Sequence, residues 1–192
     1  TVVLGRDLPG ITYFDDYTFD RSERKLILGV GLEYVYRRSK KGKYYIYDLD
    51  SKQLEAISEY DIQEPAFSPD GTKVAFVKEN NLYVKDLRDG SIAQVTSDGK
   101  KNQVINGISD WVYEEEFGED RGLFWSPDGQ RLAYASPDQS GVWAIYVVPI
   151  LGGEPQRLGQ GWAPAWGRTG LLAYTGCTED EMCGIIVDNP DD

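Results

Sequence analysis

Three consecutive glutamates, Glu114, Glu115 and Glu116, are the side chains of this sequence best suited to bind a ligand. In a strand, neighbouring side chains point to opposite faces, so Glu115 and Glu116 could not contact one ligand there. In a helical turn or an irregular loop, they could converge on a cation such as an amine. The alternative is a solvated acidic loop without a ligand, and the residues alone leave both interpretations open.

The residues of other common reactions are missing from the sequence. It contains no histidine and no Gly-x-Ser-x-Gly segment, so a Ser-His-Asp relay cannot be assembled from it. General base catalysis would then fall to carboxylates, and no substrate cleft is indicated. We expect no catalytic residue, no cofactor and no metal site.

The two cysteines, Cys177 and Cys183, are six residues apart. Two strands joined by a short loop would bring them within disulfide distance. Whether the bridge forms depends on the redox compartment, which the sequence does not give. Two thiols without a histidine make a poor metal site.

A repeat determines the architecture that must position these residues. An aromatic residue, a tight polar turn and an apolar strand recur at Phe19, Phe67, Trp125 and Trp166, at intervals of 48, 58 and 41 residues. Two copies carry the turn Ser-Pro-Asp-Gly, in which proline presets φ and glycine supplies a left-handed position. We expect the four aromatic residues to form the core between successive units.

Each unit reads as four short antiparallel strands, which is typical of a β-propeller blade. The expected fold is all-β: a single propeller domain over residues 1–192, with blades near 12–59, 60–98, 106–160 and 161–192. The fourth unit has one strand too few, and residues 1–8 begin with a strand-like segment. We therefore expect the N-terminal strand to complete the last blade and close the ring. An open half-ring that pairs with a second copy is the alternative.

Composition and charge limit the partners. The net charge of −12 argues against nucleic acid and against an anionic membrane surface, since both require a basic footprint. No run approaches the ~20 apolar residues of a membrane span. No signal peptide is visible, so we expect a cytosolic or an already trimmed chain, and the localisation stays unknown.

The segment 99–122 is the one long insertion in the repeat. No window of the chain shows the sustained periodicity of a helix of normal length. Long loops on a rigid scaffold commonly carry binding sites, and this one carries the three glutamates.

The segment from Asp110 to Glu116 resembles the double-glutamate motif of the dipeptidyl peptidase IV family, serine peptidases with an N-terminal propeller. The similarity covers residues ~8–135, including Tyr-Arg-Arg at 36–38 and Tyr-Tyr-Ile-Tyr-Asp-Leu at 44–49. It implies that Glu115 and Glu116 bind the ammonium of a peptide N-terminus. It also implies that Arg37 contacts a peptide carbonyl, with Arg38 in its place if the register slips by one.

Residues ~136–192 resemble the blades of TolB-type propellers instead, as in Gly-Val-Trp-Ala-Ile-Tyr-Val-Val-Pro at 141–149. The change of resemblance near 135–141 suggests two joined lineages, because blades are quasi-independent repeats. We therefore predict a chimeric or designed propeller.

The predicted function is that of a non-catalytic scaffold without activity of its own. The first alternative is a module that binds a peptide N-terminus, and the second is the recognition fragment of a dipeptidyl peptidase that lacks its catalytic domain. The expected partners are a peptide N-terminus and, for a half-ring, a second copy in a homodimer.

Overall fold

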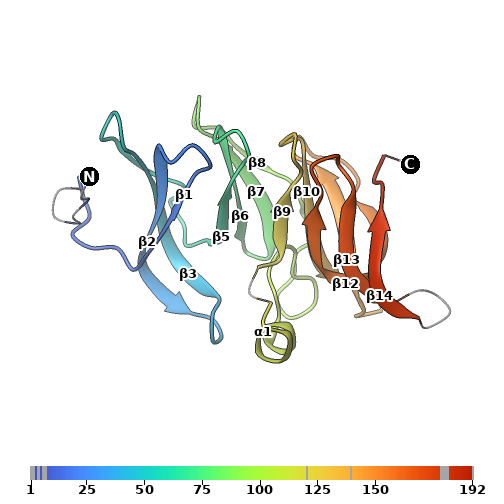
Figure 1. The fold of residues 1–192 in the computed structure, drawn as a ribbon. Coiled ribbons are helices and arrows are strands. Elements are labelled where there is room, and N and C mark those ends of the chain that lie inside the picture. The colour runs from blue at the N-terminus through green and yellow to red at the C-terminus, as the bar shows by residue number, and fades with distance from the viewer. Residues whose placement is uncertain are drawn as a thin grey trace.

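A computed structural model describes residues 3, 5, 8–119, 121–138, 140–177 and 182–191. Within them the chain forms antiparallel sheets whose neighbouring strands are consecutive in sequence, together with one short helix. The all-β class predicted from the sequence is confirmed. Figure 1 shows the sheets side by side in a row, with the helix projecting below the middle of the row.

Two sheets have four strands, and the third has six. The first sheet contains β1 (Asp16–Phe19), β2 (Lys25–Tyr34), β3 (Lys40–Asp48) and β4 (Leu54–Ala56). The second contains β5 (Gln63–Phe67), β6 (Lys73–Lys78), β7 (Asn81–Asp86) and β8 (Ile92–Gln94). The third contains β9 (Leu123–Trp125), β10 (Arg131–Pro137), β11 (Trp143–Pro149), β12 (Gln156–Trp166), β13 (Leu172–Cys177) and β14 (Cys183–Asp188). The helix α1 (Trp111–Phe117) lies between β8 and β9 in the chain.

The Ser-Pro-Asp-Gly turns are closed by the same side-chain hydrogen bonds in both copies. The Ser68 hydroxyl donates to Asp70 Oδ1 at 2.6 Å, and the backbone N–H of Lys73 donates to Ser68 Oγ at 2.9 Å. In the other copy, the Ser126 hydroxyl donates to Asp128 Oδ1 at 2.6 Å. The bond from Ser68, followed by those from Thr72, lowers the pKa of Asp70 to about 2. The sequence repeat is therefore a repeat of one hydrogen-bonded turn.

The third sheet is continuous because β12 belongs to two units. Its first half pairs with β11 and its second half pairs with β13, with a register shift between Trp162 and Ala165. The boundary expected between the third and fourth blades, at 160–161, falls inside this strand. In the structure, the outer strand of the third unit runs directly into the inner strand of the fourth.

The expected closure of the ring is not what the structure shows. Figure 1 places the first sheet and β14 at opposite ends of the row. Most of the proposed closing strand, residues 1–4, lies outside the described residues; Val3 packs against the apolar cluster of the first sheet around Leu8 and Ile11. Among the described residues, β14 is the last strand of its sheet. The single propeller domain and the half-ring homodimer stay predictions.

Apolar clusters between the sheets hold the row together. One cluster joins Ile27 and Ile46 of the first sheet to Val74 and Phe76 of the second. Another joins Val77 and other residues of the second sheet to residues of the third, among them Leu132 and Val148. Burying these side chains between neighbouring sheets supplies most of the stabilisation available to a structure without long helices.

The recurring aromatic residues contact the preceding unit of the repeat where one exists. The Trp125 indole N–H donates to the carbonyl of Ala66 at 3.0 Å, and the Trp166 indole N–H donates to that of Phe124 at 3.2 Å. Phe67 is partly buried against the cluster between the first two sheets. Phe19 is 48% exposed, so the expectation of a buried core residue was wrong there. The first unit has no preceding sheet against which Phe19 could pack.

Candidate functional site

The three glutamates lie on α1, a helix of seven residues with a signal at each end. Asp110 is its N-cap, and its side chain accepts a hydrogen bond from the backbone N–H of Tyr113 at 2.9 Å. Gly118 ends the helix in the left-handed conformation, at φ 72°. The helical turn, one of the two conformations that would let Glu115 and Glu116 serve one ligand, is therefore the one that forms.

Glu114 anchors the helix to the connection between β2 and β3. Its side chain is 1% exposed and accepts hydrogen bonds from the backbone N–H groups of Arg38 and Ser39, the latter at 3.1 Å. A carboxylate that accepts two backbone N–H groups fixes both segments, because charge-assisted bonds are about twice as strong as neutral ones. The Glu114 carboxylate is thus hydrogen-bonded within the protein, and Glu115 and Glu116 are the glutamates of α1 that remain for a ligand.

Glu115 and Arg37 are brought together by this anchor. Arg37 Nε lies 3.4 Å from Glu115 Oε2, and the Arg37 side chain is 69% exposed against 21% for Glu115. Glu116, the next residue, is exposed. Arg38, the alternative to Arg37, points elsewhere and donates through Nη1 to the carbonyl of Gly118 at 2.8 Å. The structure thus groups Arg37 with Glu115 and leaves Glu116 at the surface beside them.

Tyr113 fixes α1 from the other side, against the third sheet. Its ring centroid lies 4.7 Å from that of Trp143 and 6.0 Å from that of Trp162. Tilted and edge-on aromatic contacts of this kind stabilise by about 1 kcal/mol beyond their buried area. Burial raises the pKa of the Tyr113 hydroxyl, with a smaller contribution from Asp110. The helix is therefore held by both the first and the third sheet.

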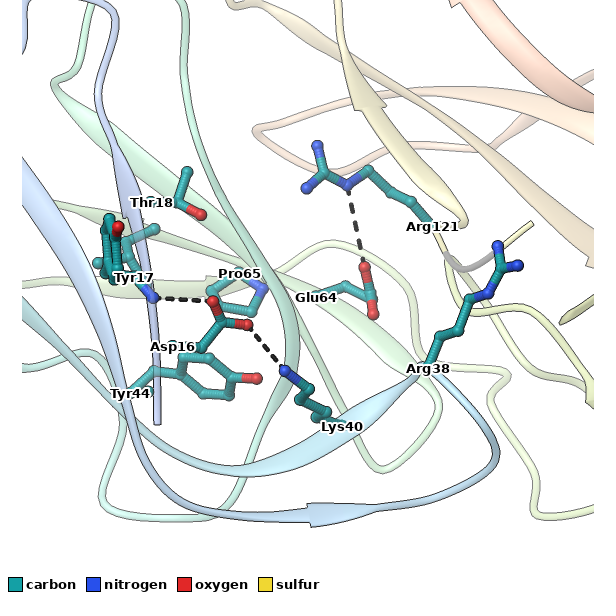
Figure 2. Close-up of a pocket in the computed structure, with 11 residues that line it drawn as sticks. Asp16, Tyr17, Thr18, Arg38, Lys40, Tyr44, Glu64, Pro65 and Arg121 are labelled. Carbon is teal, nitrogen blue, oxygen red and sulfur yellow. Dashed lines mark hydrogen bonds and ion pairs between the residues drawn. The ribbon is translucent and has the colours of Figure 1, made fainter. Parts of the chain in front are cut away.

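A second feature, which we call the charged cavity, is lined in part by Arg38, the residue after Arg37. It has a volume of about 200 Å³. Its lining comes from the first two sheets, from the β2–β3 connection and from the segment just before β9: Asp16, Tyr17, Thr18, Ile27, Gly29, Arg38, Lys40, Tyr44, Glu64, Pro65 and Arg121. Figure 2 shows Lys40 directed toward Asp16 and Glu64 directed toward Arg121, with Arg38 at the edge of the group.

The lining of the charged cavity contains two ion pairs. Lys40 Nζ lies 3.1 Å from Asp16 Oδ2, and this hydrogen bond raises the pKa of Lys40. Arg121 Nε lies 4.0 Å from Glu64 Oε2, too far for a direct hydrogen bond (Figure 2). Burial, followed by the negative charges of Glu64 and Asp16, raises the pKa of Tyr44 well above its ordinary value. The phenol of Tyr44 therefore stays protonated throughout the physiological range.

No sequence motif predicted the charged cavity, although the repeat carried a signal for part of it. When the units are aligned on their aromatic residues, Asp16 and Glu64 occupy the same position, three residues before Phe19 and Phe67. The two carboxylates therefore lie at equivalent positions of β1 and β5, and both line the charged cavity. Arg121 lies outside the aligned strands, so only the folded chain brings it to this cavity.

The disulfide left open by the sequence forms in the structure. Cys177 and Cys183 are bonded at the end of the β13–β14 hairpin, where they are direct strand partners. In the ranges that the structure describes, no three cysteine or acidic side chains gather as ligands of a metal ion would. No helix among the described residues is long and apolar enough to cross a membrane.

Comparison with known proteins shows which protein family the chain matches. The model of the dipeptidyl peptidase IV (DPP IV) N-terminal region matches residues 20–159. Prolyl endopeptidase FAP of Homo sapiens is 42% identical over 58% of the chain, and dipeptidyl peptidase 4 of Felis catus is 40% identical over 63%. The chain spans 15% of the first of these relatives and 16% of the second.

Solved structures agree on the fold. The dipeptidyl peptidase 4 of Porphyromonas gingivalis superposes with a TM-score of 0.81 over 96% of this chain and 34% of its own, at 24% identity. A putative TolB from Agrobacterium tumefaciens superposes with a TM-score of 0.58 over 96% of this chain and 65% of its own, at 15% identity. Both similarities show the fold alone at these identities.

The prediction of a chimeric or designed chain is not supported. The family match runs without interruption across the expected junction at 135–141, and one solved peptidase structure covers nearly the whole chain. The TolB-like appearance of residues 136–192 reflects the strand and turn pattern that blades of different propellers share, since the TolB structure superposes on the rest of the chain too.

Proposed function

The chain belongs to the family of the dipeptidyl peptidase IV N-terminal region, and from this we propose that it is the peptide-recognition part of a dipeptidyl-peptidase-like protein. Its 192-residue sequence contains the non-catalytic region only, without any histidine for the serine relay. In this proposal, Glu115 and Glu116 bind the free ammonium of a peptide, and Arg37 contacts the carbonyl that follows.

The observation that carries the proposal is the arrangement of Arg37, Glu114 and Glu115. Glu114 is consumed in holding the β2–β3 connection to α1, which places Arg37 3.4 Å from Glu115. A carboxylate beside a guanidinium offers an acceptor for an ammonium and a donor for the neighbouring carbonyl. A peptide N-terminus presents these two groups in that order.

The accessibility of these side chains supports the same proposal. Arg37 is mostly exposed, so its pair with Glu115 contributes little to stability and can rearrange around a ligand. Glu116 is exposed as well, and its carboxylate can join Glu115 on the same ammonium. An acidic loop that served only solubility would not require a buried glutamate to fix its orientation against another sheet.

Calorimetric titration of the 192-residue chain with Ala-Pro amide and with its N-acetylated form tests the proposal. The free amine should bind at least tenfold more tightly, since each charge-assisted bond to an ammonium contributes about 1.5–3 kcal/mol. Glu115→Gln and Glu116→Gln should each remove most of this difference. Glu154→Gln, at an exposed site away from α1, is the matched control and should change nothing.

Equal affinity for the free and the acetylated peptide would refute the ammonium site. The chain would then be a scaffold whose acidic helix faces only solvent. Loss of affinity in Glu154→Gln as large as in Glu115→Gln would also contradict the proposal, because it would show a general charge effect.

A further inference from the structure

The charged cavity adjoins the proposed ammonium site through two consecutive residues. Arg37 lies against Glu115, while Arg38 lines the cavity and donates to the carbonyl of Gly118, the residue that ends α1. Neighbouring Cα atoms are about 3.8 Å apart, so both arginines stand on the same short stretch of backbone. A ligand held by Arg37 and Glu115 therefore has the charged cavity next to it.

The cavity carries an excess of positive charge in a chain of net charge −12. Its lining includes three cations, Arg38, Lys40 and Arg121, against the two carboxylates of Asp16 and Glu64. A hollow whose lining has a net positive charge attracts anions. The excess therefore favours an anion over a second ammonium.

The two carboxylates act as supports for the cations. Asp16 holds Lys40 at 3.1 Å. Glu64 faces Arg121 across 4.0 Å, which leaves the guanidinium of Arg121 with N–H groups for a ligand. Arg38 uses Nη1 to donate to the Gly118 carbonyl, and the other N–H groups of its guanidinium can donate to a ligand. A guanidinium fork matches the geometry of a carboxylate in two parallel hydrogen bonds.

The backbone at Glu64 indicates that this carboxylate has a role beyond the fold. Glu64 has φ +52° and lies in a register shift of the β5–β6 pair. Ala163 has the same φ of +52°, the same following proline and an equivalent register shift in the β12–β13 pair. Alanine therefore satisfies the bulge, and the fold does not require a glutamate at this position. At residue 64 the bulge directs a carboxylate to the cavity wall beside Arg121.

We propose that the charged cavity binds a carboxylate of the peptide whose ammonium is held at Glu115 and Glu116; this inference rests on the proposed function. The volume of about 200 Å³ suits a single acidic side chain or chain end. The carboxylate has two sources: an acidic side chain near the N-terminus of the peptide, or the C-terminal carboxylate of a very short peptide. Recognition would thus extend from the amine to an acidic group of the same ligand.

Calorimetric titrations with two matched pairs of peptides distinguish the sources. Glu-Pro-Ala amide against Gln-Pro-Ala amide tests the side chain, and Ala-Pro-Ala with a free carboxylate against its amide tests the chain end. The parent chain should bind the acidic member of one pair at least fivefold more tightly. Arg121→Gln, at a side chain that is 55% exposed, should reduce that preference to less than twofold. Arg168→Gln, at an exposed turn, should preserve it.

The outcomes separate this inference from the proposed function. Equal affinities within both pairs, or a preference that survives in Arg121→Gln, would overturn the carboxylate site. Acetylation of Glu-Pro-Ala amide tests the ammonium site alone. If acetylation leaves the affinity unchanged while the preference for Glu over Gln persists, the ammonium site fails and the carboxylate site stands. If none of the peptides binds, both are refuted.

Discussion

Replacement of Glu114 by alanine should loosen the attachment of α1 to the first sheet. The Glu114 carboxylate is 1% exposed and accepts the backbone N–H groups of Arg38 and Ser39. Alanine would leave the buried N–H of Ser39 without its acceptor, which costs about 1–3 kcal/mol, and would remove the bond from Arg38 as well. We expect the free energy of unfolding to fall by about 3 kcal/mol. Glu114→Gln retains one acceptor oxygen and should lose about 1 kcal/mol.

Urea unfolding followed by the fluorescence of the five tryptophans measures this difference. Glu116→Ala is the matched control, because Glu116 is an exposed glutamate on the same helix and its loss should change stability by less than about 0.5 kcal/mol. The affinity for Ala-Pro amide should also fall in Glu114→Ala, since Arg37 loses its fixed position. If Glu114→Ala and Glu116→Ala had equal stability, the anchoring role of Glu114 would be wrong.

Two further predictions concern stability. Removing the disulfide with Cys177→Ser and Cys183→Ser should cost about 2 kcal/mol by the loop-entropy estimate for a separation of six residues, and an unchanged urea midpoint would contradict it. Asp70 has a folded pKa of about 2, below its ordinary value of 3.8, so its turn stabilises the fold above pH 4 and loses this contribution as the pH falls toward 2. The free-energy difference between the parent and Asp70→Asn, about 1 kcal/mol at pH 6 after solvent screening, should shrink by more than half near pH 2. A difference independent of pH would show that the carboxylate charge is irrelevant to the turn.

The local features of the fold could be predicted from the sequence because they depend on neighbouring residues. The hydrogen bonds that close the turn at Ser68 and Asp70 join residues within a six-residue segment, and the proline and glycine of that segment predict the turn. The arrangement of the three sheets relative to one another could not be predicted in this way. Closure depends on the summed rotation between successive sheets, which does not follow from the repeat.

The candidate site was predictable only in part. The sequence did not predict α1, because seven residues are too few to show helical periodicity; its caps, Asp110 and Gly118, come from the structure. The roles of Glu115, Glu116 and Arg37 came from resemblance to a family, whereas the anchoring by Glu114 emerged from burial. The charged cavity combines Asp16, which is in the first unit, with Arg121, which lies near the end of the insertion, so its existence depends on how the insertion packs against the first two sheets.

The pH dependence of peptide affinity tests most directly whether this chain recognises a peptide ammonium. The α-amino group of a peptide has a pKa of about 8 in water and loses its charge above it. Burial and the charges beside it raise the pKa of Tyr44, so this nearby phenol does not titrate in the same range. We expect the affinity for Ala-Pro amide to be constant from pH 6 to 7.5 and to fall about tenfold per pH unit above 8.5. An affinity that stays constant up to pH 9.5 would contradict recognition of the ammonium by Glu115 and Glu116.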